Sequence, residues 1–299
     1  MKFDNQKVDT SGVDDRRGAR GGRGLAVGGG AGVVGLLVVL LVSFLGGGGA
    51  TNALDPAFLD SVLGAGGAAS STSDLATRCA EPGAIDRYDD CYIVKVYNET
   101  DEIWNDEIAA LAETYRSPQL VLYSGQVSTA CGSASAQVGP FYCPGDEAIY
   151  LDLEFMAALQ QQFGAEGRYA QAYIVAHEFG HHIQTVLGIE PQVRRAQRQD
   201  PSSANQLSVA MELQADCFAG VWGRLANDRG NLSVTQTEVQ QAQDAAAAVG
   251  DDRIQRQTQG RVDPEGWTHG SAQQRRTWYD RGFDGGQVSV CDTFAPGAL

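Results

Sequence analysis

The stretch "YIVAHEFGHHIQTVLG" (residues 173–188) places three of the chain's four histidines within six positions of an otherwise apolar segment. Its apolar spacing predicts a helix, which puts His177 and His181, four positions apart, on one face. Two imidazoles at this spacing with Glu178 between them form the H-E-x-x-H pattern, which binds zinc. Zinc lowers the pKa of a bound water from about 15.7 to about 7, and a nearby carboxylate can take its proton.

A second pair, Glu212 and Asp216, lies in "MELQADCFAG" (residues 211–220) and also has a spacing of four. In metzincins the zinc helix continues into a glycine and a third histidine, but Gln184 and Leu187 stand there, so the third ligand must come from elsewhere. On one helix face, Glu212 can complete the metal ligands while Asp216 accepts a hydrogen bond from a ligand histidine. The alternatives are a chance H-E-x-x-H and a solvated acidic helix face.

The segment "LAVGGGAGVVGLLVVLLVSFL" (residues 25–45) has no charge over its 21 residues, enough to span a bilayer core of about 30 Å as a helix. Four arginines precede it, so the positive-inside rule predicts a single-pass anchor with residues 1–24 in the cytoplasm and the remainder outside. A cleaved signal peptide is the alternative, because small residues follow in "GGGGATNA". Residues 46–78 are rich in Gly, Ala and Ser, which indicates a flexible linker, and residues 79–299 then form the folded domain.

The cysteines support this topology, because all six lie beyond the apolar segment and an even number favours disulfides outside the cytoplasm. We expect Cys79–Cys91 and Cys131–Cys143 to close short loops and Cys217–Cys291 to form a long-range pair, although six cysteines allow 15 pairings. The chain has no C-x-x-C spacing, which argues against a zinc finger.

The folded part combines helical and strand patterns. Residues 96–115, 168–188 and 206–227 have helical spacing, whereas "QLVLYSG" (119–125) and "EAIYLDLEF" (147–155) are typical of strands. This combination predicts an α+β fold with a small sheet. The segment 147–155 is either an edge strand that can pair with an extended peptide or an ordinary core strand.

The net charge is −15, and residues 25–299 carry −17 because residues 1–24 contain six basic and four acidic side chains. A body this acidic argues against nucleic acid as a partner.

Six stretches together resemble the bacterial neutral zinc metallopeptidase family, whose members are membrane-anchored and of the glutamate-zincin type. They are "VDTSGVDDRRG", "ACGSASAQVGPFYCPGDEAIYLD", "AYIVAHEFGHHIQ", "ELQADCFAGVW", "GDDRIQ" and "THGSAQQRRTWYDRGFDGG". The resemblance covers nearly the whole chain. It implies a zincin-like domain that binds one zinc ion through His177, His181 and Glu212, uses Glu178 as the base, and cleaves a peptide or protein outside the cytoplasmic membrane. It supplies neither the physiological substrate nor a partner for "VDTSGVDDRRG".

Three other residues are weaker candidates. His269 is predicted to stabilise the oxyanion, as a downstream polar residue does in comparable zincins, or else to be a structural loop histidine. Tyr279 has the same two alternatives, with a packed aromatic favoured. His182 lies about 100° around the helix from His181, which predicts a supporting or surface position. Two other functions stay open, namely a catalytically idle zinc-binding scaffold and an amidase that acts on cell-wall stem peptides.

Overall fold

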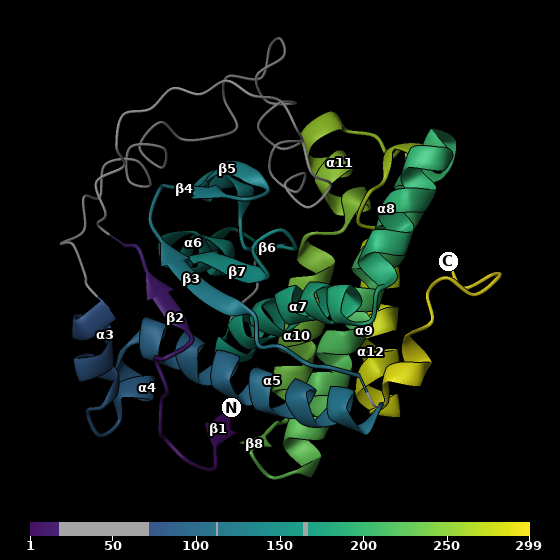
Figure 1. Cartoon of the computed structure of the whole chain (residues 1–299). Helices are drawn as coiled ribbons and strands as arrows, with labels where there is room; N and C mark the ends of the chain where they lie inside the picture. Colours follow the sequence, from purple (N-terminus) through teal and green to yellow (C-terminus); the bar gives the residue numbers. More distant parts are fainter. Residues whose placement is uncertain (18–71, 112, 164–166) are drawn as a thin grey trace. The chain divides into compact units, whose positions relative to one another are not determined.

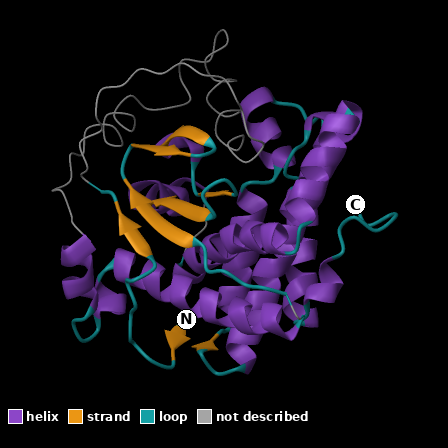
Figure 2. Ribbon diagram, in the orientation of Figure 1, coloured by secondary structure: helices purple, strands orange, loops and turns teal. Residues whose placement is uncertain are grey.

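The computed structural model describes residues 1–17, 72–111, 113–163 and 167–299 (Figure 1). These residues form two compact units, which we call the helical unit (residues 1–7, 95–118 and 159–299) and the sheet unit (residues 8–94 and 119–158). Figure 2 shows that helices predominate and that strands form small sheets, which confirms the predicted mixture of helix and sheet.

The sheet unit contains a four-stranded sheet in the order β2-β3-β7-β6. Its strands are β2 (Val13–Asp15), β3 (Gln119–Tyr123), β7 (Ala148–Asp152) and β6 (Phe141–Cys143). β2 and β7 run parallel to β3, whereas β6 is antiparallel to β7. The other elements are the hairpin β4 (Gln126–Thr129) and β5 (Gly132–Ser135), the helices α3 (Thr72–Cys79) and α4 (Ala84–Arg87), and the 3-10 helix η2 (Ala136–Val138).

Strand β7 decides between the two interpretations of residues 147–155. It lies between β3 and β6, and all five of its residues are buried. Phe141 of β6 stacks on Tyr150 of β7 with ring centroids 4.8 Å apart. The segment is therefore a core strand and not an edge strand, and its last residues instead begin α6 (Leu153–Phe163).

All three expected disulfides are present, namely Cys79–Cys91, Cys131–Cys143 and Cys217–Cys291. The first joins α3 to α5 (Asp89–Ala110), and the second joins the β4–β5 turn to β6. The third joins α9 (Ala204–Asp228) to the 3-10 helix η5 (Val288–Cys291). The predicted pairing is confirmed.

The N-terminal residues are part of both folded units, which differs from our expectation of a separate cytoplasmic segment over residues 1–24. In the helical unit, β1 (Lys2–Phe3) pairs with β8 (Leu232–Ser233). In the sheet unit, β2 extends the sheet beside β3. Backbone-paired strands must share one compartment, so residues 1–17 cannot lie across a membrane from their partner strands.

Partly buried ion pairs hold β2 in place. Arg17 contacts both carboxylate oxygens of Asp15, at 2.7 and 2.6 Å, and it reaches Asp90 in α5 at 3.0 Å. Arg78 in α3 also pairs with Asp90. The part of "VDTSGVDDRRG" that the structure describes thus connects a strand to the helices of the sheet unit.

Replacing Val13 by aspartate tests whether β2 is docked in solution. Val13 is 6% exposed, so the change removes apolar burial and buries a carboxylate, which should cost about 3 kcal/mol. Thermal unfolding of the full chain should shift down by roughly 6–12 °C. Ser11→Asp, at an exposed position, is the control. Equal unfolding temperatures for the two variants would show that β2 is not docked and would restore a separate N-terminal segment.

Two other boundaries concern the predicted linker and anchor. Residues 72–78 belong to α3, where Leu75 is fully buried, so the flexible linker expected over residues 46–78 does not extend to its predicted end. The predicted anchor at residues 25–45 lies outside the described residues. Among the residues that are described, no helix is long and apolar enough to cross a membrane.

The helical unit is built around α7 (Arg168–Val186), which is buried on nearly all sides. α9 packs against α7 and also against α12 (Ala272–Gly285). The remaining helices are α8 (Ile189–Gln199), α10 (Gln236–Ala248), α11 (Asp251–Gln259), η3 (Pro201–Ser203) and η4 (Pro264–Gly266). α7 and α9 match the helices predicted at residues 168–188 and 206–227.

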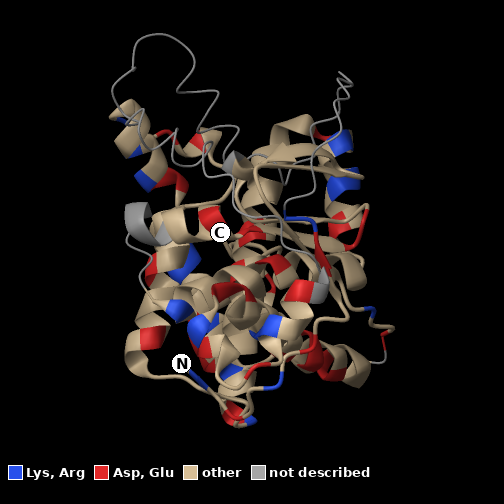
Figure 3. Ribbon diagram, turned by 90° about the vertical axis from the view of Figure 1, so that its left-hand side faces the viewer, with Lys and Arg blue, Asp and Glu red and all other residues tan. Residues whose placement is uncertain are grey.

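Charged side chains of both signs are interspersed along the ribbon (Figure 3). A few are buried in the helical unit, including the ion pair of Lys95 with Glu99, in which both residues are 3% exposed. Burying an ionised group is costly unless it is paired, so each buried charge calls for a partner or a function.

Candidate metal centre

Glycine lets the two helices that carry the predicted site approach closely. A Cβ atom at Gly180 of α7 would lie 2.8 Å from the Cα atom of Ala215 in α9, closer than real Cβ contacts. Any larger residue at position 180 would therefore push the helices apart. This contact brings the histidines of α7 opposite the acidic residues of α9.

The side chains of His177, His181 and Glu212 converge, with one ligand atom of each lying within 4.8 Å of the others. The Nε2 atom of His177 is 3.2 Å from Glu212 Oε2, and that of His181 is 3.5 Å from Glu212 Oε1. A tetrahedral zinc ion with bonds of about 2.1 Å has ligand atoms roughly 3.4 Å apart. Both nitrogen–oxygen distances are close to this separation, one to each oxygen of Glu212, and the nitrogen and oxygen donors are those that zinc accepts.

The outer nitrogen of each imidazole has a partner of its own. His177 Nδ1 donates to Asp216 Oδ1 at 2.9 Å, and His181 Nδ1 donates to the amide oxygen of Gln184 at 2.9 Å. Gln184 is held in turn, because its amide nitrogen donates to the carbonyl of Met211 at 2.7 Å. With both Nδ1 atoms engaged, both Nε2 atoms are left to face the space beside Glu212.

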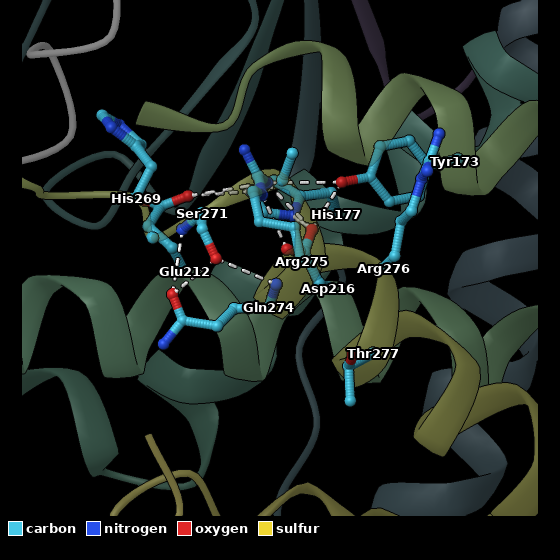
Figure 4. Close-up of polar contacts among 12 residues, drawn as sticks. Tyr173, His177, Glu212, Asp216, His269, Ser271, Gln274, Arg275, Arg276 and Thr277 are labelled. Carbon is cyan, nitrogen blue, oxygen red and sulfur yellow. Dashed lines mark hydrogen bonds and ion pairs between the residues drawn. The ribbon is translucent and has the colours of Figure 1, made fainter. Parts of the chain in front are cut away.

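Asp216 is fully buried and is neutralised by Arg275 of α12, which is 1% exposed. Arg275 donates to both carboxylate oxygens, from Nε at 2.7 Å and from Nη2 at 2.8 Å. The Tyr173 hydroxyl donates to the same carboxylate at 2.5 Å (Figure 4). Burial raises the pKa of Asp216, but Arg275 and His177 outweigh it and lower that pKa, so the carboxylate stays ionised.

The charges of the predicted ligand residues affect one another's pKa values. Burial raises the pKa of Glu212, but the charges of His181, His269 and His177 and a hydrogen bond from His177 lower it overall. Burial lowers the pKa of His177, yet Asp216 and Glu212 raise it to about 10. An imidazole binds zinc only when its ligand nitrogen has no proton, so metal binding must displace a proton from His177.

Glu178 is 4% exposed and follows His177 directly in α7. A helix turns by about 100° per residue, so Glu178 lies beside the face shared by His177 and His181. It is placed next to the ligands without sharing their face.

His269 is 5% exposed and lies beside Glu212, on the side of the cluster away from Tyr173 (Figure 4). The loop that carries it leads into α12 through a capping box of Ser271 and Gln274. The structure thus brings His269 to the cluster, where its charge contributes to lowering the pKa of Glu212.

The other two candidates have structural positions. Tyr279 is 1% exposed, and its hydroxyl is 3.3 Å from that of Tyr169, so it is a packed aromatic residue. His182 is fully buried and donates to the carbonyl of Arg116 at 2.7 Å, so a surface position is wrong. Its ring also packs against Tyr115 edge to face.

A pocket of about 470 Å³ lies along α9 and is lined by residues that include Val209, Trp267 and Gln274. Val209 precedes Glu212 by three positions, so the two share a helix face. A Cβ atom at Gly270 would lie 3.2 Å from Val209 Cγ1. The wall of the pocket is therefore continuous with the loop that carries His269.

Sequence reasoning missed Gln184, Arg275 and Asp251, which support the predicted residues. Gln184 could have been found, because it lies three positions after His181 and thus on the same helix side. Arg275 and Asp251 reach the site from other helices, 59 positions from Asp216 and 18 from His269. Their stretches, "QQRR" and "GDDR", have no local pattern that predicts these contacts.

Comparisons with known proteins agree with this geometry. The family described as "Putative neutral zinc metallopeptidase" matches residues 1–294. The "Uncharacterized protein YpfJ" of Escherichia coli strain K12 is 48% identical over 196 residues, 65% of this chain and 68% of that protein. The "Uncharacterized protein Rv2575" of Mycobacterium tuberculosis strain H37Rv is 43% identical over 232 residues, 75% of this chain and 76% of that protein. No solved structure matches. A family match over almost the whole chain shows that the protein belongs to the neutral zinc metallopeptidase family.

Proposed function

We propose that this protein is a zinc-dependent endopeptidase that holds one zinc ion per chain through His177, His181 and Glu212. The observation that carries the proposal is the convergence of these three side chains at distances that fit tetrahedral zinc. Three protein ligands leave a fourth position for water or substrate, which is typical of catalytic sites. Membership of the family supports both zinc and peptide hydrolysis.

Zinc, when bound, supplies a water of lowered pKa and polarises the peptide carbonyl. Glu178 acts as the general base, taking the proton of the attacking water and passing it to the leaving amine. Its position next to His177, beside the ligand face of α7, supports this role. A site that only bound metal would not need this carboxylate.

His269 donates a hydrogen bond to the carbonyl oxygen as negative charge develops on it. Asp216 and Gln184 hold the two ligand histidines in the required tautomers, and Arg275 keeps Asp216 ionised. The pocket along α9 receives a side chain of the peptide substrate, because its wall is continuous with the His269 loop.

We also propose that the enzyme acts outside the cytoplasm, because its three disulfides suit an oxidising compartment. The uncharged segment at residues 25–45 is not proposed as a single-pass crossing, because a spanning helix would place its two ends on opposite sides of the membrane. The cytoplasmic position expected for residues 1–24 is not retained, because β1 and β2 pair within the folded units.

Replacing Glu212 by glutamine should abolish tight zinc binding, because a neutral amide is a much weaker zinc ligand than a carboxylate. We expect the purified variant to hold less than about a tenth of the zinc of the unchanged protein, consistent with the large share of affinity that each ligand supplies. Elemental analysis after dialysis measures this. Glu190→Gln is the control, since Glu190 pairs with Arg194 in α8. Full zinc content in the Glu212 variant would show that the third ligand is another residue.

A further inference from the structure

Asp251, the first residue of α11, ties down the loop that carries His269. One carboxylate oxygen, Oδ2, accepts the backbone N–H groups of Thr268 at 2.7 Å, His269 at 2.6 Å and Gly270 at 3.0 Å. The backbone of Asp251 donates to the carbonyl of Gly270 at 2.9 Å in return. Three successive N–H groups around one oxygen form an anion-binding concavity. Oδ2 and the backbone N–H of Asp251 together anchor the loop.

The other oxygen contacts the imidazole ring itself. Asp251 Oδ1 is 3.2 Å from His269 Nδ1, and the Thr268 hydroxyl is 3.0 Å from the same nitrogen. An ionised carboxylate only accepts hydrogen bonds, so Nδ1 must carry a proton. The ring orientation is then fixed, and Nε2 is the nitrogen left to meet a ligand. Anchoring the loop does not require this second contact.

We infer that Asp251 is a positioning residue that orients the His269 imidazole for its hydrogen bond to the substrate oxyanion. The inference rests on the proposed function, because it assigns the ring a substrate to act on. To donate from Nε2 while Nδ1 faces the carboxylate, the ring must carry a proton on each nitrogen, and Asp251 is the anion that lies opposite it. Asp251 acts only through His269 and touches neither substrate nor metal ligand.

A purely structural role for Asp251 is the competing explanation, and Asp252 provides the matched control. Asp252 is the next residue of the same helix turn, and its Oδ1 accepts the backbone N–H of Ala272 at 2.7 Å. It also anchors the start of α12, and the described contacts of its side chain involve only Ala272 and Arg256. Asn in place of either aspartate keeps an acceptor for the backbone and removes the charge.

The kinetic test uses the zinc-loaded full chain and a peptide substrate. Asp251→Asn should lower kcat by about 10²-fold, as for loss of one oxyanion donor, while KM changes little. Asp252→Asn should leave both constants near those of the unchanged protein. In a His269→Gln background, Asp251→Asn should lower kcat no further, because the two residues act as a unit. The inference would be overturned if Asp251→Asn lowered kcat equally in the His269→Gln background. It would also be overturned if Asp251→Asn did not lower kcat in the otherwise unchanged protein.

A second readout does not depend on activity. ¹⁵N NMR of protein labelled with ¹⁵N-histidine measures the protonation of the ring nitrogens, and the His269 signals are assigned by comparison with His269→Gln. Nδ1 of His269 should carry a proton. Its signal should change with Asp251→Asn and should not change with Asp252→Asn. An Nδ1 without a proton in the unchanged protein would overturn the inference. If no variant hydrolyses any peptide, the proposed function fails, while the ring measurement still decides whether Asp251 orients His269.

Discussion

Replacing Glu178 by glutamine is expected to lower peptide hydrolysis by about 10²–10⁴-fold, the range for loss of a general acid–base group. Glutamine keeps the shape of the side chain and can still form hydrogen bonds, but it cannot take a proton. Because Glu178 lies beside the ligand face of α7 and not on it, zinc content and unfolding temperature should barely change. Single-turnover and steady-state kinetics measure the rate of hydrolysis, elemental analysis measures the zinc content, and thermal unfolding measures the stability.

Glu107→Gln is the matched control for this prediction, because Glu107 lies in α5 and pairs with Arg229 on the surface. It should retain the activity of the unchanged protein. Hydrolysis by the Glu178 variant within a few-fold of that control would rule out Glu178 as the base. An inactive unchanged protein that still binds zinc would favour the idle scaffold.

Replacing Arg275 by methionine should give the largest loss of stability, about 3–5 kcal/mol, because it leaves Asp216 buried without its countercharge. Arg275 is 1% exposed and donates twice to that carboxylate, which is itself shielded from solvent. Asp216 would then take a proton or move, and the hydrogen bond to His177 would weaken. We therefore expect zinc affinity to fall together with the free energy of unfolding, measured by chemical denaturation of the metal-free protein.

The neighbouring Arg276 offers a direct comparison. Its partner is Asp244, and both side chains are about two-fifths exposed, at 38% and 42%. An exposed ion pair contributes at most about 1 kcal/mol, so Arg276→Met should be nearly neutral and should retain zinc. Similar losses for the two variants would mean that the buried network does not stabilise the site.

The helices of the site could be predicted from the sequence because their information is local. His177 and His181 are placed together by a spacing of four, and Glu212 and Asp216 by the same spacing. Gly180 lies within the predicted metal helix and has no side chain to keep α7 and α9 apart, but its contact with Ala215 is known only from the structure. An even count of cysteines and the short spacing of two pairs favoured the observed disulfides, although six cysteines allow 15 pairings.

What the sequence did not show depends on contacts between distant segments. β1 and β2 are two and three residues long, too short for a periodic pattern, and they exist because β8 and β3 provide partners. The sequence does not distinguish Arg275 from the other arginines near it, because its contact with Asp216 forms only when α12 packs on α9. The interior position of β7 depends on β6, which no local signal identified as its neighbour. The anchor at residues 25–45 stays a prediction.

Digestion of a peptide library by the purified full chain, with and without a metal chelator, tests the central claim most directly. The N-terminal residues must be included, because they form part of both units. We predict cleavage by the zinc-loaded protein, loss of cleavage with the chelator, and recovery when about one equivalent of zinc per chain is restored. Cleavage that persists after zinc is removed, or no cleavage by fully zinc-loaded protein, would contradict a zinc endopeptidase built on His177, His181 and Glu212.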